Sequence, residues 1–305
     1  MKAYFFRHIL SFFLLICFSI PRAACETGGK PAFGEGEVTD TMIIGSMPVL
    51  PDTISFAGET VPLHKRQIRE QLDREFLYIH SQTGTLSYII KLANRWFPVI
   101  EAILTEQGIP ADFKYLCIAE SNLQNLISKS FAVGFWQFMP RTAPGYNLEI
   151  SNTVDERYHV SKSTVAACKY LHQAYKKFGS WTAAAASYNC GQGAYHAATV
   201  FQQTSNYYDL DIRDETNKYI FRIVSFKQLL EHQADYGFTI PDTALYPPIV
   251  TRVVQVKTRI PNLASFAIKN SITFKELKML NPWLRKHSLE VKPGKTYHIL
   301  LPVSE

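Results

Sequence analysis

One glutamate, Glu120, lies in a stretch whose apolar residues recur at helical spacing. Phe113, Leu116, Cys117 and Glu120 stand at i, i+3, i+4 and i+7, which places them on one face of a helix. Burial on that face disfavours the charged carboxylate and raises its pKa, as a general acid working near neutral pH requires. A glutamate here can instead end the helix and bond to backbone, or pair with Arg157. Glu120 is therefore a candidate catalytic residue with a structural alternative.

The segment after this glutamate, "SKSFAVGFWQFMP" from Ser128 to Pro140, offers groups that bind sugars. It contains hydroxyls, a glycine that permits close backbone approach, the amide of Gln137, and the rings of Phe135 and Trp136. Sugars need polar groups for their hydroxyls and aromatic faces for their C–H sides. The segment therefore indicates a carbohydrate site, although Trp136 is equally suited to the core.

The elements that must position these residues are mainly helical. Apolar periodicity predicts helices from Leu63 to about Gln107, with a kink or a new start at Pro98, and another helix opened by Pro110 and Asp112. Further helices are predicted at about 161–178, 182–188 and 215–232. After residue 250, "TRVVQV" and "TYHILLP" read as strands around two short helices, so a small βααβ module follows the helical part.

The N-terminus has the pattern of an export signal. Lys2 and Arg7 precede an apolar run at 9–20 that is short for a membrane span, and two alanines follow. We therefore predict a signal peptide over 1–24, a lead-in over 25–60, and a location in the periplasm or cell envelope. Cys25 is a candidate lipid attachment site, as in an outer-membrane lipoprotein, whereas Arg22 is atypical of such signals.

Charge and cysteine content exclude several classes of function. Loss of residues 1–24 removes three cations and no acids, so the net charge of +6 falls to +3, too little for nucleic-acid binding. Cys117, Cys168 and Cys190 lack the paired spacing of a disulfide framework or a metal site. Cys168 lies on an apolar stripe and is a core candidate. No cofactor is expected.

Four motifs occur in an order that resembles the soluble lytic transglycosylase family, which has a goose-lysozyme-like fold. They are Glu120-Ser121, the segment 134–140, the segment 186–191 ("ASYNCG"), and Glu215-Thr216 followed by Tyr219. The likeness spans roughly 86–236 and is greatest to the membrane-bound lytic murein transglycosylase D type, which carries lysin motifs after its catalytic domain. It implies a mainly α, lysozyme-like catalytic domain over 61–240 and a lysin-motif-like module over 250–303.

The resemblance also implies a role for each matched position. Glu120 matches the catalytic acid and base, and Ser128 matches the serine that supports the reacting sugar. The other matches are substrate-binding positions: Gln137 and Met139 in the cleft, Tyr188 close to the acid, and Glu215 in the acidic motif.

The chain departs from the family pattern at three places. Phe131 stands where the family usually has glycine, the segment from Glu120 to Ser128 is one residue shorter than usual, and Asn217 replaces the arginine of the family's "ETR" motif. The first two departures affect the role that the resemblance implies for Ser128. The third means that the contact of that arginine is missing or is made by another residue.

The reaction that the resemblance implies is non-hydrolytic cleavage of peptidoglycan between N-acetylmuramic acid and N-acetylglucosamine, with formation of a 1,6-anhydro ring. Two alternatives are a hydrolytic muramidase and a catalytically silent peptidoglycan-binding protein. Ordinary glycosidases need a second carboxylate, and the candidates are Glu149, Asp155, Glu156 and Glu215. Asp155 and Arg157 are predicted to form a structural ion pair at a helix entry.

The C-terminal βααβ module resembles a lysin motif, which binds glycans that contain N-acetylglucosamine. It lacks the glycine-aspartate-threonine turn of that motif, and a structural cap on the enzyme is the alternative. Leu277, Leu280 and Trp283 are core candidates in either case. The sequence leaves the oligomeric state open.

Overall fold

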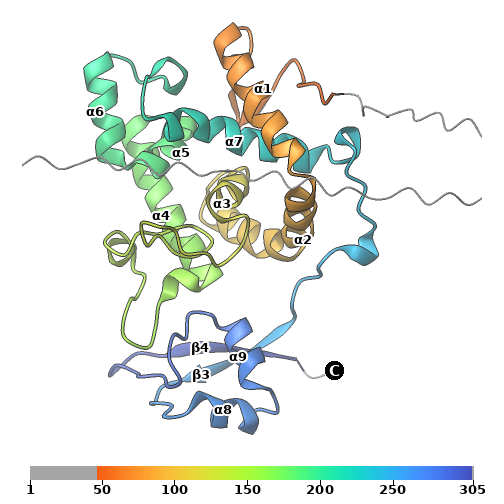
Figure 1. Ribbon diagram of the computed structural model, residues 1–305. Coiled ribbons are helices and arrows are strands. Elements are labelled where there is room, and N and C mark those ends of the chain that lie inside the picture. The colour runs from red at the N-terminus through yellow and green to blue at the C-terminus, as the bar shows by residue number, and fades with distance from the viewer. Residues whose placement is uncertain (1–46, 304–305) are drawn as a thin grey trace, which may run out of the picture. The chain divides into compact units, whose positions relative to one another are not determined.

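A computed structural model describes residues 47–303 of the chain (Figure 1). The signal peptide over 1–24, Cys25 and the lead-in as far as residue 46 lie outside the described residues. The signal peptide, the lipid attachment site and the lead-in therefore remain predictions from the sequence.

The helical part begins with two long helices, α1 (Arg66–Ser81) and α2 (Thr83–Glu106). Helix α2 continues through Pro98, at which the sequence had suggested a kink or a new start. Apolar residues recur along one face of each helix, and those faces are buried in the main core.

Helix α3 (Phe113–Ser121) starts where Pro110 and Asp112 predicted a helix. The Asp112 carboxylate, however, does not cap its own helix. It accepts hydrogen bonds from the backbone N–H of Ala57 at 2.8 Å and from the ammonium group of Lys227 at 2.8 Å. Asp112 therefore ties α3 to two distant segments.

Four helices complete this part: α4 (Val160–Phe178), α5 (Trp181–Cys190), α6 (Gln192–Gln202) and α7 (Asp214–Glu231). Helix α7 packs against α1, α3 and α5. Helix α6 was not predicted, and of its residues only Tyr195 is buried. Short 3-10 helices lie at Ala143–Tyr146, Glu156–Tyr158, Tyr207–Asp209, Ala234–Tyr236 and Asp242–Ala244.

A hairpin of two very short strands, β1 (Ser55–Phe56) and β2 (Glu59–Thr60), precedes α1. It lies in the segment predicted to be a lead-in, yet Phe56 is fully buried in the main core. The Glu59 carboxylate accepts the N–H groups of Trp181 and Thr182 at 2.6 and 2.9 Å and so binds the N-terminus of α5. The packed structure therefore begins earlier than residue 61.

The C-terminal module has the predicted βααβ order. Strands β3 (Thr251–Val256) and β4 (Tyr297–Pro302) pair antiparallel in full register, from Thr251 opposite Pro302 to Val256 opposite Tyr297. Helices α8 (Leu263–Lys269) and α9 (Phe274–Leu280) connect them. Leu277 and Trp283 are buried, as expected of core residues. The predicted mainly α fold with a small βααβ module is confirmed.

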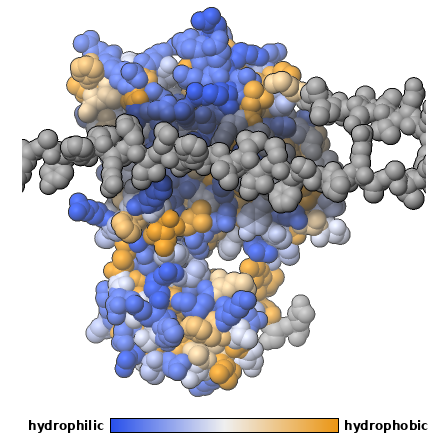
Figure 2. Space-filling view, viewed as in Figure 1, coloured by the Kyte–Doolittle hydropathy of each residue, from blue (hydrophilic) through white to orange (hydrophobic). Residues whose placement is uncertain are grey.

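The surface over α1 is mainly hydrophilic on the side seen in Figure 2, and hydrophobic residues elsewhere on this side form small groups. Among the described residues, none of the helices combines the length and apolar character that crossing a membrane needs.

Candidate active site

Glu120 lies in the last turn of α3, on the face that the sequence predicted. Phe113, Leu116 and Cys117 on that face are fully buried, whereas Glu120 is half-buried. The helix ends directly afterwards, because Asn122 adopts a left-handed conformation. Glu120 therefore projects from a fixed helix end at the margin of the core.

The Glu120 carboxylate accepts a hydrogen bond from the hydroxyl of Tyr219, a residue of α7. Tyr219 is almost completely buried, so its ring has little freedom to move. The structural alternative was an ion pair between Glu120 and Arg157, but Arg157 pairs with Asp155 instead. The partner of Glu120 is thus a neutral donor rather than a cation.

Burial raises the pKa of Glu120 to about 7, far above its ordinary value of 4.5. The hydrogen bond from Tyr219 and the positive charge of Arg222 act in the opposite direction, whereas the negative charge of Glu215 adds to the increase. A pKa near neutrality leaves both the protonated and the ionised form of Glu120 accessible, which suits a group that must both donate and accept a proton.

Glu120→Gln should make the protein more stable at pH 8 and change little at pH 4. Since folding raises the carboxyl pKa from 4.5 to about 7, the cost of ionisation is absent below the lower value. It grows between the two values and reaches at most about 3 kcal/mol above the higher one. The uncharged amide avoids this cost. Thermal unfolding at both pH values measures it, and equal melting temperatures at pH 8 would contradict the burial argument.

Tyr188, predicted to lie close to the acid, donates its hydroxyl hydrogen bond to the backbone carbonyl of Trp136 at 2.8 Å. Burial, together with the charge of Glu120, raises the pKa of Tyr188 well above its ordinary value. Trp136 itself is a core residue, since it is fully buried and its indole N–H donates to Thr164 Oγ1 at 2.8 Å. The tyrosine that bonds to the acid is therefore Tyr219.

A pocket of about 500 Å³ brings three of the predicted site residues together, namely Gln137, Met139 and Tyr188. Its wall also contains the rings of Phe138, Tyr146 and Tyr170, with centroids of Tyr170 and Tyr188 4.9 Å apart. The Gln137 amide donates to the carbonyl of Gly134 at 2.8 Å, and Met139 is 40% exposed. The pocket offers both aromatic faces and polar groups to a sugar ring.

Glu215 joins this pocket to the acid. Asn189 lines the pocket, and its side-chain amide lies 3.4 Å from the exposed Glu215 carboxylate. The Thr216 hydroxyl donates to the Asn189 side-chain carbonyl at 2.7 Å, which orients that amide. The charge of Glu215 in turn raises the pKa of Glu120.

Ser128 begins a tight turn in the site loop, by which we mean residues 126–139. Its hydroxyl oxygen accepts the N–H groups of Ala132 at 3.0 Å and Ser130 at 3.2 Å, and its carbonyl accepts the N–H of Phe131. Phe131 occupies the left-handed region with φ of 65°. Glycine is the residue that adopts this backbone conformation at least cost.

Phe131→Gly should stabilise the protein by about 0.5–1 kcal/mol. A side chain at φ of 65° costs about 1–2 kcal/mol, and the extra unfolded-chain entropy of glycine offsets about half of that gain. Little burial is lost, because the Phe131 side chain is 70% exposed. Urea unfolding measures the change. Phe131→Ala keeps the strained Cβ and should show no comparable gain.

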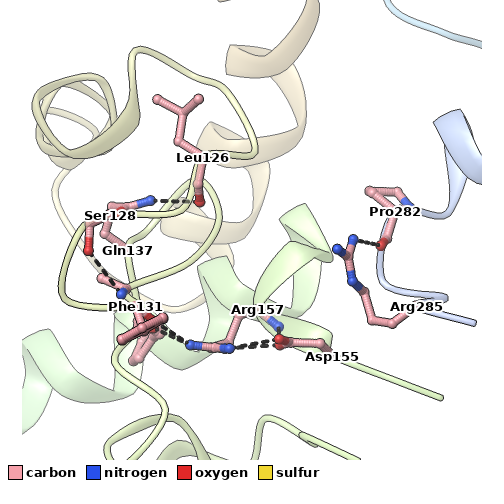
Figure 3. A network of polar contacts seen from close by, with 10 residues as sticks. Leu126, Ser128, Phe131, Gln137, Asp155, Arg157, Pro282 and Arg285 are labelled. Atoms are coloured by element: carbon pink, nitrogen blue, oxygen red, sulfur yellow. Dashed lines mark hydrogen bonds and ion pairs between the residues drawn. The ribbon is translucent and has the colours of Figure 1, made fainter. Parts of the chain in front are cut away.

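Arg157 holds the site loop through its guanidinium group (Figure 3). Its guanidinium group pairs with Asp155 at 2.7 Å and donates to the carbonyls of Phe131 at 2.9 Å and Phe138 at 3.1 Å. The predicted ion pair between Asp155 and Arg157 is confirmed. The Arg157 backbone carbonyl also lies so close to Gly134 that a Cβ there would be 2.0 Å from it.

Three of the four candidate second carboxylates are engaged in ion pairs. Glu149 contacts Lys295, Asp155 contacts Arg157, and Glu156 contacts Lys162 at 2.5 Å. Glu215 alone acts on the pKa of Glu120. Among the four, Glu215 is therefore the candidate second carboxylate for a hydrolytic mechanism.

Asn217 replaces the family's arginine without taking over its charge. Its side chain donates to the Ile212 carbonyl at 2.9 Å and accepts the Ile212 N–H at 3.2 Å, so it closes the loop before α7. Arg222, one turn beyond Tyr219, is the cation whose charge acts on Glu120. No signal in the sequence had singled out Arg222.

Two known protein families match the chain, one in the helical part and one in the C-terminal module. Residues 97–210 match the transglycosylase SLT domain, a range that includes Glu120 and the pocket. The chain carries a transglycosylase SLT domain. Residues 252–305 match the soluble lytic transglycosylase C-terminal LysM-like domain, which contains the βααβ module. The predicted resemblance is thereby confirmed.

The chain is also similar to proteins of named function. The chain is 26% identical over 204 residues to membrane-bound lytic murein transglycosylase D of Escherichia coli K12 and, equally, of strain O6:H1. The match covers 63% of this chain and 44% of those proteins, so the chain spans less than half of their length. A putative tributyltin chloride resistance protein of Alteromonas sp. strain M-1 is 30% identical over 131 residues, which cover 41% of this chain and 58% of that protein.

Proposed function

We propose that this protein is a peptidoglycan lytic transglycosylase in which Glu120 is first the general acid and then the general base. One observation carries the proposal: within an SLT domain, the Glu120 carboxyl lies half-buried on an apolar helix face, bonds to Tyr219, and has a pKa of about 7. Beside it lies a pocket with aromatic walls. Membrane-bound lytic murein transglycosylase D, a relative of this chain, has this activity by name.

In the first step, protonated Glu120 donates its proton to the glycosidic oxygen between N-acetylmuramic acid and N-acetylglucosamine. The bond from the muramyl C1 to that oxygen breaks, and positive charge develops at C1. The substrate's own N-acetyl group stabilises that charge, so no second protein carboxylate is needed. The hydrogen bond from Tyr219 stabilises the Glu120 carboxylate as it forms.

In the second step, the Glu120 carboxylate takes the proton from the muramyl C6 hydroxyl. The C6 oxygen then bonds to C1, which closes a 1,6-anhydro ring and releases the product. Glu120 returns to its protonated form, and no water is consumed. A pKa near 7 serves both steps, since a much lower value would slow the first and a much higher value the second.

Substrate-binding roles are assigned to five residues around the acid. Gln137, Met139 and Tyr188 line the pocket, and Glu215 connects to it through Asn189. Ser128 acts indirectly, since its hydroxyl accepts two backbone N–H groups and so fixes the turn of the site loop. That hydroxyl still has its own proton to donate to a sugar.

Digestion of purified peptidoglycan in ¹⁸O-enriched water tests the reaction type. A lytic transglycosylase releases anhydro products without the label, because the C6 hydroxyl supplies the oxygen. A hydrolytic muramidase, the alternative that would use Glu215, incorporates one labelled oxygen for each bond cleaved. Labelled reducing ends as the main products would overturn the proposed reaction.

Tyr219→Phe should shift the alkaline limb of the pH–rate profile to higher pH. In the wild-type protein, the hydrogen bond from Tyr219 lowers the pKa of Glu120. Removing this bond therefore raises that pKa, and Glu120 stays protonated up to a higher pH. The shift should reach up to about one pH unit. Tyr188→Phe is the matched control, because its hydroxyl bonds to Trp136 rather than to the acid. An equal shift in both variants would contradict the assignment.

We further propose that the protein acts on peptidoglycan strands in the cell envelope after export. The signal-like pattern over 1–24 and the relationship to membrane-bound transglycosylases support this location. Tethering through an acylated Cys25 is part of the proposal, and mass determination of the mature protein from membranes tests it. An unmodified Cys25 in a soluble envelope fraction would argue against tethering.

A further inference from the structure

The LysM-like domain shares a hydrophobic core with the SLT domain. Residues 47–303 belong to one compact unit. One buried cluster joins Trp283, Leu284 and Tyr297 of the LysM-like domain to Val133 and Val154. Val133 belongs to the site loop, in which its N–H donates to the Phe138 carbonyl at 3.1 Å. A side chain of the site loop is therefore packed in the core of the LysM-like domain.

Backbone hydrogen bonds join the same two domains along residues 149–158, which we name the bridging segment. Val154 pairs with Leu284 in an isolated antiparallel bridge. The Asp155 N–H donates to the Trp283 carbonyl at 2.9 Å, and the Arg285 N–H donates to the Thr153 carbonyl at 2.8 Å. The segment thus behaves as an extra edge of the LysM-like domain.

Charged groups of the LysM-like domain also contact the bridging segment. The Glu149 carboxylate, 9% exposed, contacts the Lys295 ammonium group and accepts the Tyr297 hydroxyl at 2.9 Å. The Lys295 ammonium group also lies 3.9 Å from buried Glu156. Arg285 stacks its guanidinium group over the Tyr158 ring at 3.9 Å. A buried carboxylate that has lost its donors is costly, so these contacts are held firmly.

The bridging segment passes this support on to the site loop. Asp155, anchored to Trp283, forms the ion pair that orients Arg157, and Arg157 donates to the carbonyls of Phe131 and Phe138 (Figure 3). In the sequence, Phe131 and Phe138 stand on either side of Gly134 and Gln137. A continuous set of contacts therefore connects the LysM-like domain with the substrate-binding loop.

We propose that the LysM-like domain positions the site loop, through the bridging segment and Arg157, and is not only a glycan-binding attachment. This inference rests on the proposed function, because that function makes the site loop part of the substrate-binding site. Its structural content is independent of it: loosening the contacts of Glu149 must loosen residues 126–139.

The test is hydrogen–deuterium exchange of the full chain carrying the double substitution Lys295→Ala, Tyr297→Phe. These changes remove two donors from Glu149 and keep the Tyr297 ring that packs on Trp283. Exchange of the amides in 126–139 should become about tenfold faster. The control is Lys275→Ala, an exposed lysine on α9 of the same domain, which should leave the loop unchanged. Unchanged exchange of the loop in the double variant would overturn the proposal.

Kinetics on isolated glycan strands separate positioning from simple attachment. A loosened site loop should lower kcat about fivefold or more, whereas loss of a glycan-binding attachment raises KM and leaves kcat unchanged. A pure KM effect would overturn the proposal. Because the exchange measurement needs no activity, it remains decisive even for a protein that fails to cleave peptidoglycan.

Discussion

Glu120→Gln should lower the rate of glycan cleavage about a thousandfold, because general acid–base catalysis by a positioned side chain contributes about 10²–10⁴. The amide keeps the shape of the side chain and still accepts the hydrogen bond from Tyr219. The amide can neither donate a proton to the glycosidic oxygen nor accept the proton of the C6 hydroxyl. Both proposed steps fail together, so the loss should appear in kcat rather than in KM.

Glu106→Gln is the matched control for this substitution. Glu106 is an exposed residue at the end of α2 and should give wild-type rates. Turnover by the Glu120 variant within tenfold of wild type would mean that another group carries the proton. Glu215 would then be the first residue to examine, because its charge acts on Glu120.

Gly134→Ala should destabilise the protein by about 3 kcal/mol or more and lower activity as well. The added Cβ would lie 2.0 Å from the Arg157 carbonyl, and the backbone at this position has φ of 86°. Since the obstructing atom belongs to the backbone, a side-chain rotation cannot relieve the clash. The site loop must move, and Arg157 must loosen its hold on Phe131 and Phe138.

Thermal unfolding measures this effect, with an expected decrease in Tm of about 6–12 °C for a protein of this size. Gly84→Ala is the control, because Gly84 lies in the first turn of α2 with nothing near its Cβ position. That change should leave stability equal or slightly higher, since alanine favours a helix. Equal stability of the two variants would contradict the close approach at Gly134.

Much of the helical fold could be predicted, because its helices have apolar stripes. The face of Glu120 and the βααβ order follow directly from periods of 3.6 and 2 residues. Helix α6 was missed although apolar residues recur along it, whereas the β1–β2 hairpin has strands of two residues, which are too short to show a period. The hairpin is held by tertiary contacts, such as Phe56 in the core, that local patterns do not encode.

The candidate site could be predicted only in part, for a similar reason. The type and environment of Glu120 follow from its neighbours in sequence, whereas its partner Tyr219 lies 99 residues away on another helix. Tyr188 was expected close to the acid, and the charge of Glu120 does act on it, but its hydroxyl donates to the Trp136 carbonyl of the site loop rather than to the carboxylate. Which of two tyrosines reaches a carboxylate depends on helix packing, and a motif alone does not specify that packing.

Mass analysis of the muropeptides released from purified peptidoglycan, by wild type beside Glu120→Gln, tests the central claim most directly. The account predicts anhydro-muropeptides, each lighter by one water than the hydrolytic product, from wild type and none from the variant. Reducing-end muropeptides as the main wild-type products, or anhydro-muropeptides released equally by the variant, would contradict it. No release by wild type would instead favour a protein that binds peptidoglycan without cleaving it.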